Sequence, residues 1–271
     1  MKRFLTTLHS FYKTHKRDSL PWRKTKDTYK ILVSEVMLQQ TQVSRVLIKY
    51  KEFLRQFPTA DTLAQAKLSD VLKMWQGLGY NRRAKFLYEA SKVLSTASKK
   101  DLADYNFLLS LPGVGQSTAG AVLAFTQNKP VVFIETNIRA IILHHFFKDV
   151  PKVSDKEIYT VVEKLLTRLP TDFSVRDFYY ALYDYGVHLK STLGKEQQLL
   201  HKRSAHYTKQ STFTGSRRQL RAFILKKFLE IGDVKKLETV VYTEKPKSLS
   251  TYTKEDIKTL INTLRVEGFF K

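Results

Sequence analysis

Hydrophobic residues recur at helical spacing along most of the chain. The pattern turns helical at residue 28, and residues 31–38 are apolar nearly all round, which is typical of a buried helix. Residues 43–54 continue the pattern with apolar positions three and four apart. The same spacing predicts helices within 1–20 and at about 61–66, 69–76, 83–97, 101–109, 116–126, 154–168 and 175–189. Sustained alternation of apolar and polar residues is missing before the C-terminal end, so the fold class is predicted to be all-α.

The density of apolar residues changes near residue 190, which suggests the domain organisation. Gly, Ser, Thr, Lys and Gln accumulate after that point, so we expect a domain at 1–190 and a linker at 191–215. Residues 216–271 contain three helical segments followed by a glycine turn and two phenylalanines, a pattern that predicts three helices and a short strand. This unit is either winged-helix-like or a helical packing element that never touches nucleic acid, and both readings stay open.

Charge and cysteine content narrow the function classes. The formal net charge of +22, from 47 basic and 25 acidic residues, favours nucleic acid as a partner, with an anionic membrane as the second choice. No apolar run approaches membrane-spanning length, and the basic N-terminus lacks the apolar core of a signal peptide, so we expect a cytoplasmic, nucleoid-associated or nuclear protein that is not secreted. The absence of cysteine excludes disulfides, zinc fingers and cysteine-held iron–sulfur clusters, and we expect neither a metal nor a cofactor.

A glycine turn and a following carboxylate point to chemistry on a phosphate-bearing polymer. The sequence LPGVG at 111–115 leads directly into a helix-forming run, where free backbone N–H groups and the helix dipole make an anion site. Glu135 follows the apolar run 131–134 and precedes another helix. We therefore expect a phosphate-binding turn close to a positioned carboxylate.

Two carboxylates are expected to lie in different environments. Glu35 sits within an apolar helix, so burial should raise its pKa and keep it protonated. Glu135 begins a helix, where the dipole and nearby donors favour the anion. One neutral acid and one ionised carboxylate are the arrangement that cleaves glycosidic bonds. The residues alone leave two alternatives open: a buried acid satisfied by hydrogen bonds at Glu35, and an ordinary acid of a first helical turn at Glu135.

Four stretches together resemble one known family. They are SEVMLQQTQV at 34–43, LPWR at 20–23, GLGY at 77–80 and LPGVG at 111–115 with the glycine at 120. In this order they are similar to adenine-DNA glycosylases of the MutY type, within the helix-hairpin-helix superfamily that also contains endonuclease III. The resemblance covers about residues 18–190. It implies a helix-hairpin-helix glycosylase domain with a six-helix lobe at about 28–134 and a second lobe formed by the N-terminus and about 135–190.

The resemblance also implies roles for individual residues. Glu35 would protonate the departing purine, Asn137 matches an asparagine beside the catalytic carboxylate Glu135, and Ser117 stands where lyase-competent relatives carry a nucleophilic lysine. Without that amine no Schiff base forms, so base removal by water without strong strand cleavage is expected. The expected DNA contacts are Gln39, Gln40, Tyr80, Arg82, Leu111, Gly113, Val114, Gly115 and Gln116. The expected base pocket is lined by Trp22, Arg23 and Tyr180.

The chain departs from the family pattern in four ways. Glu135 replaces an aspartate and is one methylene longer, and a displacement of about 1 Å can cost ~10²-fold in rate. The first cluster cysteine would fall at Lys190, so packing and basic residues would have to replace the cluster's roles. Tyr180 stands where relatives offer an amide or carboxylate to the adenine edge. The resemblance does not extend to the family's domain that reads oxidised guanine. The basic residues that would have to replace the cluster's roles are Lys195, Lys202 and Arg203.

These observations predict a monofunctional DNA glycosylase of base excision repair that removes adenine mispaired with guanine or oxidised guanine. Its partner would be double-stranded DNA with a mismatch or damaged base, bound by a monomer with no membrane partner. Two alternatives remain. The same scaffold would act on thymine or uracil opposite guanine, or the protein would bind mismatches or lesions without catalysis. A pure binder has no reason to keep Glu35 inside an apolar helix.

Overall fold

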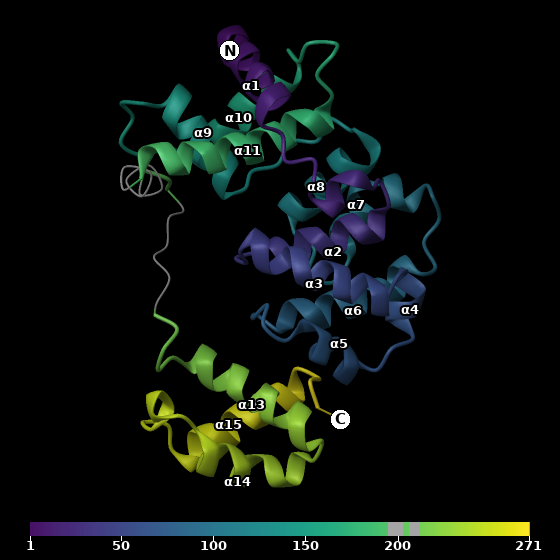
Figure 1. The fold of residues 1–271 in the computed structure, drawn as a ribbon, viewed down its shortest axis with the longest axis vertical. Helices are drawn as coiled ribbons and strands as arrows, with labels where there is room; N and C mark the ends of the chain where they lie inside the picture. The colour runs from purple at the N-terminus through teal and green to yellow at the C-terminus, as the bar shows by residue number, and fades with distance from the viewer. Residues whose placement is uncertain (195–202, 206–211, 271) are drawn as a thin grey trace. The chain divides into compact units, whose positions relative to one another are not determined.

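The computed structural model describes residues 1–194, 203–205 and 212–270, and these residues are overwhelmingly helical (Figure 1). No β-strand forms among them, and a single isolated bridge joins Val153 and Ser204. The all-α prediction is therefore confirmed. In the same residues, no helix is long and apolar enough to cross a membrane.

Contacts divide the chain into two compact units, one formed by residues 1–36 and 97–208 and the other by residues 37–96 and 209–271. Each unit thus combines segments that are distant in sequence. The predicted boundaries at residues 190 and 215 are not tested by this division and stay predictions. Most of the predicted linker lies outside the described residues.

The first unit is built around α11 (Val175–Leu193), whose N-terminus is capped by the Ser174 side chain. Helices α1, α8 and α9 pack against it, while α10 packs on α9 and α7 on α8 (Figure 1). A capping box of Ser154 and Glu157 opens α10. The bounds are α1 (Lys2–His15), η1 (Pro21–Lys24), α7 (Tyr105–Ser110), α8 (Gln116–Gln127), α9 (Thr136–Phe146) and α10 (Asp155–Leu166).

The second unit contains four short helices and the C-terminal bundle. Helix α6 packs on α4 and α5, and α3 packs on α5. The helix predicted to run on from residue 38 is interrupted, because Gln40 has a left-handed φ of 54°. The bounds are α2 (Thr28–Leu38), α3 (Val43–Gln56), α4 (Ala60–Ala64), α5 (Leu68–Trp75) and α6 (Arg82–Leu94), with the division between units falling inside α2.

The C-terminal residues form three helices as expected, α13 (Arg217–Ile231), α14 (Val234–Glu244) and α15 (Lys254–Val266). The strand predicted after them is wrong. Gly268 takes a φ of 76°, and the N–H of Phe269 donates to the Leu264 carbonyl at 3.0 Å, which closes α15 instead. Phe269 and Phe270 are both buried, with the ring of Phe270 4.5 Å from that of Phe228. No strand follows α15 among the described residues, so the winged-helix comparison is not confirmed.

Candidate active site

Glu35 lies on α2, half-buried among apolar neighbours such as Ile31 and Leu32. Burial raises the pKa of its carboxyl to about 8, and the negative charge of Glu135 adds to the rise, while Arg23 opposes it. No hydrogen-bond donor contributes to this shift. Glu35 therefore holds its proton near neutral pH. The main cause is burial, as its position in an apolar helix predicts.

Glu135 caps the N-terminus of α9 with its own side chain. One carboxylate oxygen accepts from the N–H groups of Asn137 at 2.9 Å and Ile138 at 3.1 Å, and the other lies 3.5 Å from the Asn137 amide nitrogen. The extra methylene is therefore taken up by folding the side chain back over the helix end. Each of these donors lowers the pKa of Glu135 and so favours the anion, as expected. Burial outweighs the donors and raises the pKa of Glu135 overall.

Side-chain hydroxyls hold the segment 131–134 that leads to Glu135. The segment lies outside any helix and pairs with no strand among the described residues, so its carbonyls need other partners. The Tyr179 hydroxyl donates to the carbonyl of residue 131 at 2.8 Å, and Tyr159 donates to that of residue 132. Ser117 on α8 donates to the carbonyl of residue 134 at 2.7 Å. In the described structure Ser117 thus supports the backbone immediately before Glu135.

Two glycines allow neighbouring helices to approach this segment closely. A Cβ at Gly120 on α8 would lie 2.9 Å from the Phe133 Cβ, and one at Gly186 on α11 would lie 2.6 Å from the Asn137 Cβ. Real Cβ atoms essentially never come so close, so only glycine fits without movement at either site. Both glycines therefore set where Glu135 and Asn137 stand.

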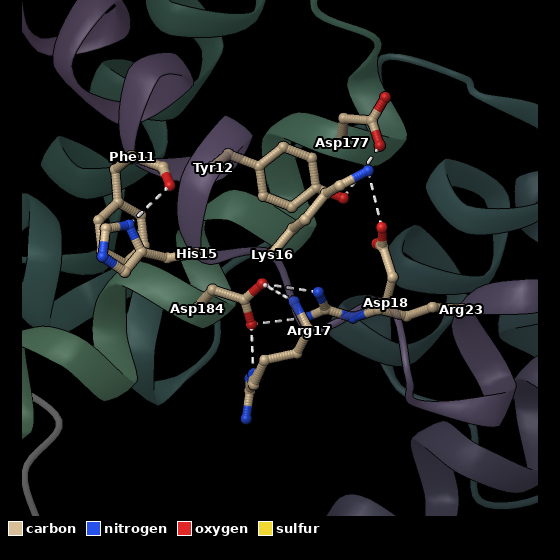
Figure 2. A network of polar contacts seen from close by, with 9 residues as sticks. All are labelled: Phe11, Tyr12, His15, Lys16, Arg17, Asp18, Arg23, Asp177 and Asp184. Atoms are coloured by element: carbon tan, nitrogen blue, oxygen red, sulfur yellow. Dashed lines mark hydrogen bonds and ion pairs between the residues drawn. The ribbon is translucent and has the colours of Figure 1, made fainter.

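A buried ion-pair network holds the predicted pocket residue Arg23 (Figure 2). Its two terminal nitrogens donate to the two oxygens of Asp184 at 2.6 and 2.8 Å, and Arg17 donates to the same carboxylate. The Arg23 guanidinium also lies 4.4 Å from the centre of the Tyr180 ring. The pairing ties η1 and the chain after α1 to α11.

The three predicted pocket residues are all packed in the structure. Trp22 is buried in η1, and the Tyr180 ring stacks on Phe125 at 4.3 Å with Arg23 near its ring. The buried Tyr180 hydroxyl has no well-aligned hydrogen bond, although Arg176 is close enough to oppose the rise that burial causes in its pKa. Their role in recognising a base stays a prediction.

The predicted hairpin adopts its expected form between α7 and α8. Gly113 has a φ of 74°, whereas Gly115 has a φ of −95° and does not need the left-handed region. Leu111 and Val114 are buried and anchor the turn, while Gly113, Gly115 and Gln116 are exposed. Among the described residues no side chain caps α8, so this end keeps the character of an anion site.

In the second unit, one arginine organises the two loops that carry Gln39, Gln40 and Tyr80. Tyr80 has a φ of 47°, so it shares the left-handed conformation of Gln40, and both side chains are exposed. Arg83 is itself largely buried, and burial lowers its pKa to about 10. It donates at 2.5–3.1 Å to the carbonyls of Met37, Gln39, Leu78 and Gly79 and to the Thr41 hydroxyl.

C-terminal side chains of the second unit contact the same loop region. Glu267, directly after α15, pairs with the predicted DNA contact Arg82 and with Arg221. Arg218 on α13 donates to the Tyr80 hydroxyl at 3.0 Å. The C-terminal bundle therefore supports the loop that presents Tyr80.

The residues present do not fit the iron–sulfur cluster that the resemblance implies. The chain has no cysteine, and Lys190 stands in the last turn of α11, where an amine cannot replace a thiolate ligand. Of the basic residues named as substitutes, Arg203 donates to the Val150 carbonyl at 2.8 Å. Lys195 and Lys202 lie outside the described residues.

Sequence reasoning missed several residues that the structure brings to the site. Gly186, Asp184 and Tyr183 all lie on α11, and their importance depends on which face of that helix meets α9 and η1. In the second unit, the role of Arg83 as a donor to protein carbonyls was also missed. The one signal for this role in the sequence was the neighbouring GLGY turn, which indicates a loop whose carbonyls need a donor.

The chain is similar in sequence to known DNA repair proteins. Residues 33–171 match the family described as "HhH-GPD superfamily base excision DNA repair protein". The chain is 34% identical over 184 residues to an adenine DNA glycosylase of Buchnera aphidicola subsp. Baizongia pistaciae, with 68% of this chain and 52% of that protein covered. It is 41% identical over 139 residues to an adenine DNA glycosylase of Mycobacterium tuberculosis (strain ATCC 25618 / H37Rv), with 51% and 45% covered.

A solved structure of a thermostable thymine-DNA glycosylase is similar with a TM-score of 0.57 and 26% sequence identity. The similarity covers 68% of this chain and 85% of that chain. The chain spans about half the length of the curated relatives it matches.

Gly186→Ala is expected to destabilise the protein, because the new Cβ would collide with Asn137. Overpacking of this kind costs about 1–3 kcal/mol. Urea denaturation followed by circular dichroism measures the loss. Gly115→Ala is the control, since nothing lies within 4 Å of the position that its new methyl group would take and its φ is ordinary. Equal stability of Gly186→Ala and the unchanged protein would contradict the tight contact.

Glu35→Gln is expected to change how stability depends on pH. The carboxyl has a pKa of about 8 in the folded protein and an ordinary value of 4.5, so the folded state binds the extra proton between these values. Its contribution is complete below pH 4.5 and is lost as the pH rises through 8. The variant should therefore gain stability relative to the unchanged protein at pH 9, on the order of a few kcal/mol.

The measurement is the free energy of unfolding at pH 5, 7 and 9 for both proteins. A constant difference across this range would show that Glu35 titrates normally in the folded state.

Proposed function

The chain belongs to the HhH-GPD superfamily of base excision DNA repair proteins, and we propose that it is a monofunctional DNA glycosylase that removes mispaired adenine. The observation that carries this proposal is the pair of half-buried carboxylates. Glu35 has a pKa of about 8 and is suited to donate a proton, whereas Glu135 is surrounded by donors that favour its anion. Two carboxyl groups with different environments are what acid-assisted cleavage of a glycosidic bond requires.

The reaction follows from these two environments. The target nucleotide leaves the base stack, at a cost of a few kcal/mol, before either carboxyl group reaches it. Glu35 gives its proton to the base as the C–N bond breaks and the bonding electrons leave with the base. Glu135 stabilises the positive charge on the sugar until water adds to the same carbon and releases a proton. Ser117 offers no amine for a Schiff base, so the strand should stay intact.

Binding would use both the charge and the exposed loops of the protein. The net charge of +22 suits binding to double-stranded DNA that contains a mismatch or a damaged base. The protein would bind this DNA as a monomer, in the compartment that holds the DNA. The hairpin at 111–115 would hold phosphates without reading sequence. Gln39, Gln40 and Tyr80 would occupy the space left by the flipped nucleotide, with their loops supported by Arg83 and Arg218.

The identity of the base is supported by the relatives named adenine DNA glycosylase. A second candidate is thymine or uracil opposite guanine, because the similar solved structure is that of a thymine-DNA glycosylase. Tyr180 favours this alternative over adenine, because a tyrosine side chain cannot reproduce the paired contacts that an amide makes with adenine. A mismatch binder without activity is the remaining alternative.

The test of the proposal is an excision assay on four duplexes. They carry adenine opposite oxidised guanine, adenine opposite guanine, thymine opposite guanine and uracil opposite guanine, and alkali follows the incubation. We expect alkali-labile sites on the adenine duplexes and none on the other two. Binding to all four without any labile site would identify a binder instead.

Glu35→Gln serves as the control for the acid, and it should lose excision while keeping DNA binding. Full excision by this variant would overturn the assignment of Glu35. Strand breaks before alkali treatment would contradict the role given to Ser117.

Glu135→Asp is expected to slow excision by about 10²-fold, even though it restores the residue type of the family. The backbone before residue 135 is held by Tyr179, Tyr159 and Ser117, so it cannot move to compensate for a shorter side chain. Aspartate is a good N-cap, so stability should hardly change. Single-turnover rates and thermal melting measure the two effects, and a faster Glu135→Asp enzyme would show that the longer side chain is a handicap.

A further inference from the structure

One face of α11 runs along the segment that carries Glu135. Tyr179, Tyr183 and Gly186 are spaced i, i+4 and i+7, so they lie on this face. At one end, the Tyr179 ring stacks on Phe133 at 4.0 Å. At the other end, Gly186 lies against Asn137. Tyr183 stands between these two contacts and therefore faces the midpoint of residues 133–137, which is Glu135.

The surroundings of Tyr183 agree with this register. Its ring meets Phe125 edge-on, with centroids 5.8 Å apart. Burial, followed by the charges of Glu35 and Glu135, raises its pKa well above the ordinary value for a phenol. The hydroxyl therefore keeps its proton throughout the working pH range and lies close enough to both carboxylates to be affected by their charges.

The other hydroxyls near the segment are engaged or face elsewhere. Tyr179, Tyr159 and Ser117 donate to backbone carbonyls. The charge of Glu35, but not that of Glu135, acts on the hydroxyl of Tyr180. Among the described residues, no hydrogen bond contributes to the pKa of Tyr183, so its hydroxyl remains available to a carboxylate.

We propose that Tyr183 is a positioning residue of the active site, whose hydroxyl donates to the Glu135 carboxylate and holds it as the anion facing the sugar. This inference rests on the proposed glycosylase function. Catalytic hydrogen bonds are often long in a ligand-free protein and shorten when substrate binds. The backbone donors reach Glu135 from the start of α9, and Tyr183 reaches it from α11, so together they restrain a side chain that is one methylene longer than aspartate.

The proposal also explains how Glu35 keeps its proton beside Glu135. An ionised Glu135 raises the proton affinity of Glu35, so a donor that favours the Glu135 anion also favours the neutral acid. The charged and titratable groups that face this pair come from several elements. They are Arg23 from η1, Arg139 from α9, and Tyr180 and Tyr183 from α11.

The test is Tyr183→Phe, which keeps the ring against Phe125 and removes only the hydroxyl. Loss of a hydrogen bond to a charged group should lower the single-turnover excision rate by about 10–100-fold at neutral pH. The acidic limb of the pH–rate profile should move up by roughly one pH unit, because Glu135 becomes easier to protonate. DNA binding should be unchanged.

Tyr185→Phe is the matched control. Its hydroxyl lies on the same helix but meets His145 Nε2 at 3.0 Å, so its removal should leave both the rate and the pH profile unchanged. Equal behaviour of Tyr183→Phe and Tyr185→Phe would overturn the proposal, since a role in packing alone does not move a pH profile.

A second readout does not depend on excision. Carbon-13 NMR titration of the glutamate carboxyl groups, assigned with Glu35→Gln and Glu135→Gln, should show a higher pKa for Glu135 in Tyr183→Phe. If the unchanged protein excises no base but this shift is seen, the proposed function fails while the role of Tyr183 stands. An unshifted Glu135 would overturn that role even in an active enzyme.

If Tyr183→Phe does not fold, Glu135→Gln replaces it as the test. Neutralising Glu135 should move the NMR signal of the Tyr183 phenol carbon, and an unmoved signal would overturn the proposal.

Discussion

The first unit depends on how the unpaired segment 131–134 is held between helices. A segment outside helices and strands leaves its carbonyls to be satisfied by side chains, and hydroxyls from α8, α10 and α11 meet this need. Gly120 and Gly186 let α8 and α11 come close enough for those contacts to form. The carboxylate at the end of the segment is therefore placed by packing on several sides, and its position follows from the way the surrounding helices are assembled.

That placement creates an electrostatic difference between two carboxyl groups of the same chemical type. Burial raises the pKa of both, but Glu135 stands at a helix start with backbone and amide donors, whereas burial and a neighbouring negative charge dominate at Glu35. Each group also acts on the other, because the charge on Glu135 makes the proton on Glu35 harder to remove. The difference between acid and anion is thus a property of the pair and of the groups around it.

In the second unit, buried polar contacts support strained loops. Gln40 and Tyr80 adopt left-handed backbone conformations that cost non-glycine residues energy and that persist only where the surroundings hold them. Arg83 supplies these surroundings by donating to both loops at once, and Arg218 holds the Tyr80 hydroxyl. An arginine used in this way is not available to a phosphate. The positive charge of the chain is therefore divided between supporting its own loops and attracting a polyanion.

Most helices, the hairpin turn and the family could be predicted from the sequence alone, because helical periodicity, glycine turns and short motifs are local signals. It failed where an outcome depends on residues distant in the chain. The strand expected at the C-terminal end became a buried pair of phenylalanines, because Phe270 packs on Phe228. The net rise in the pKa of Glu135, the use of Arg83 on carbonyls, and the approach of Gly186 to α9 came from contacts in the folded protein. Burial and contact between distant segments exist only once the helices have packed, so no local pattern carries them.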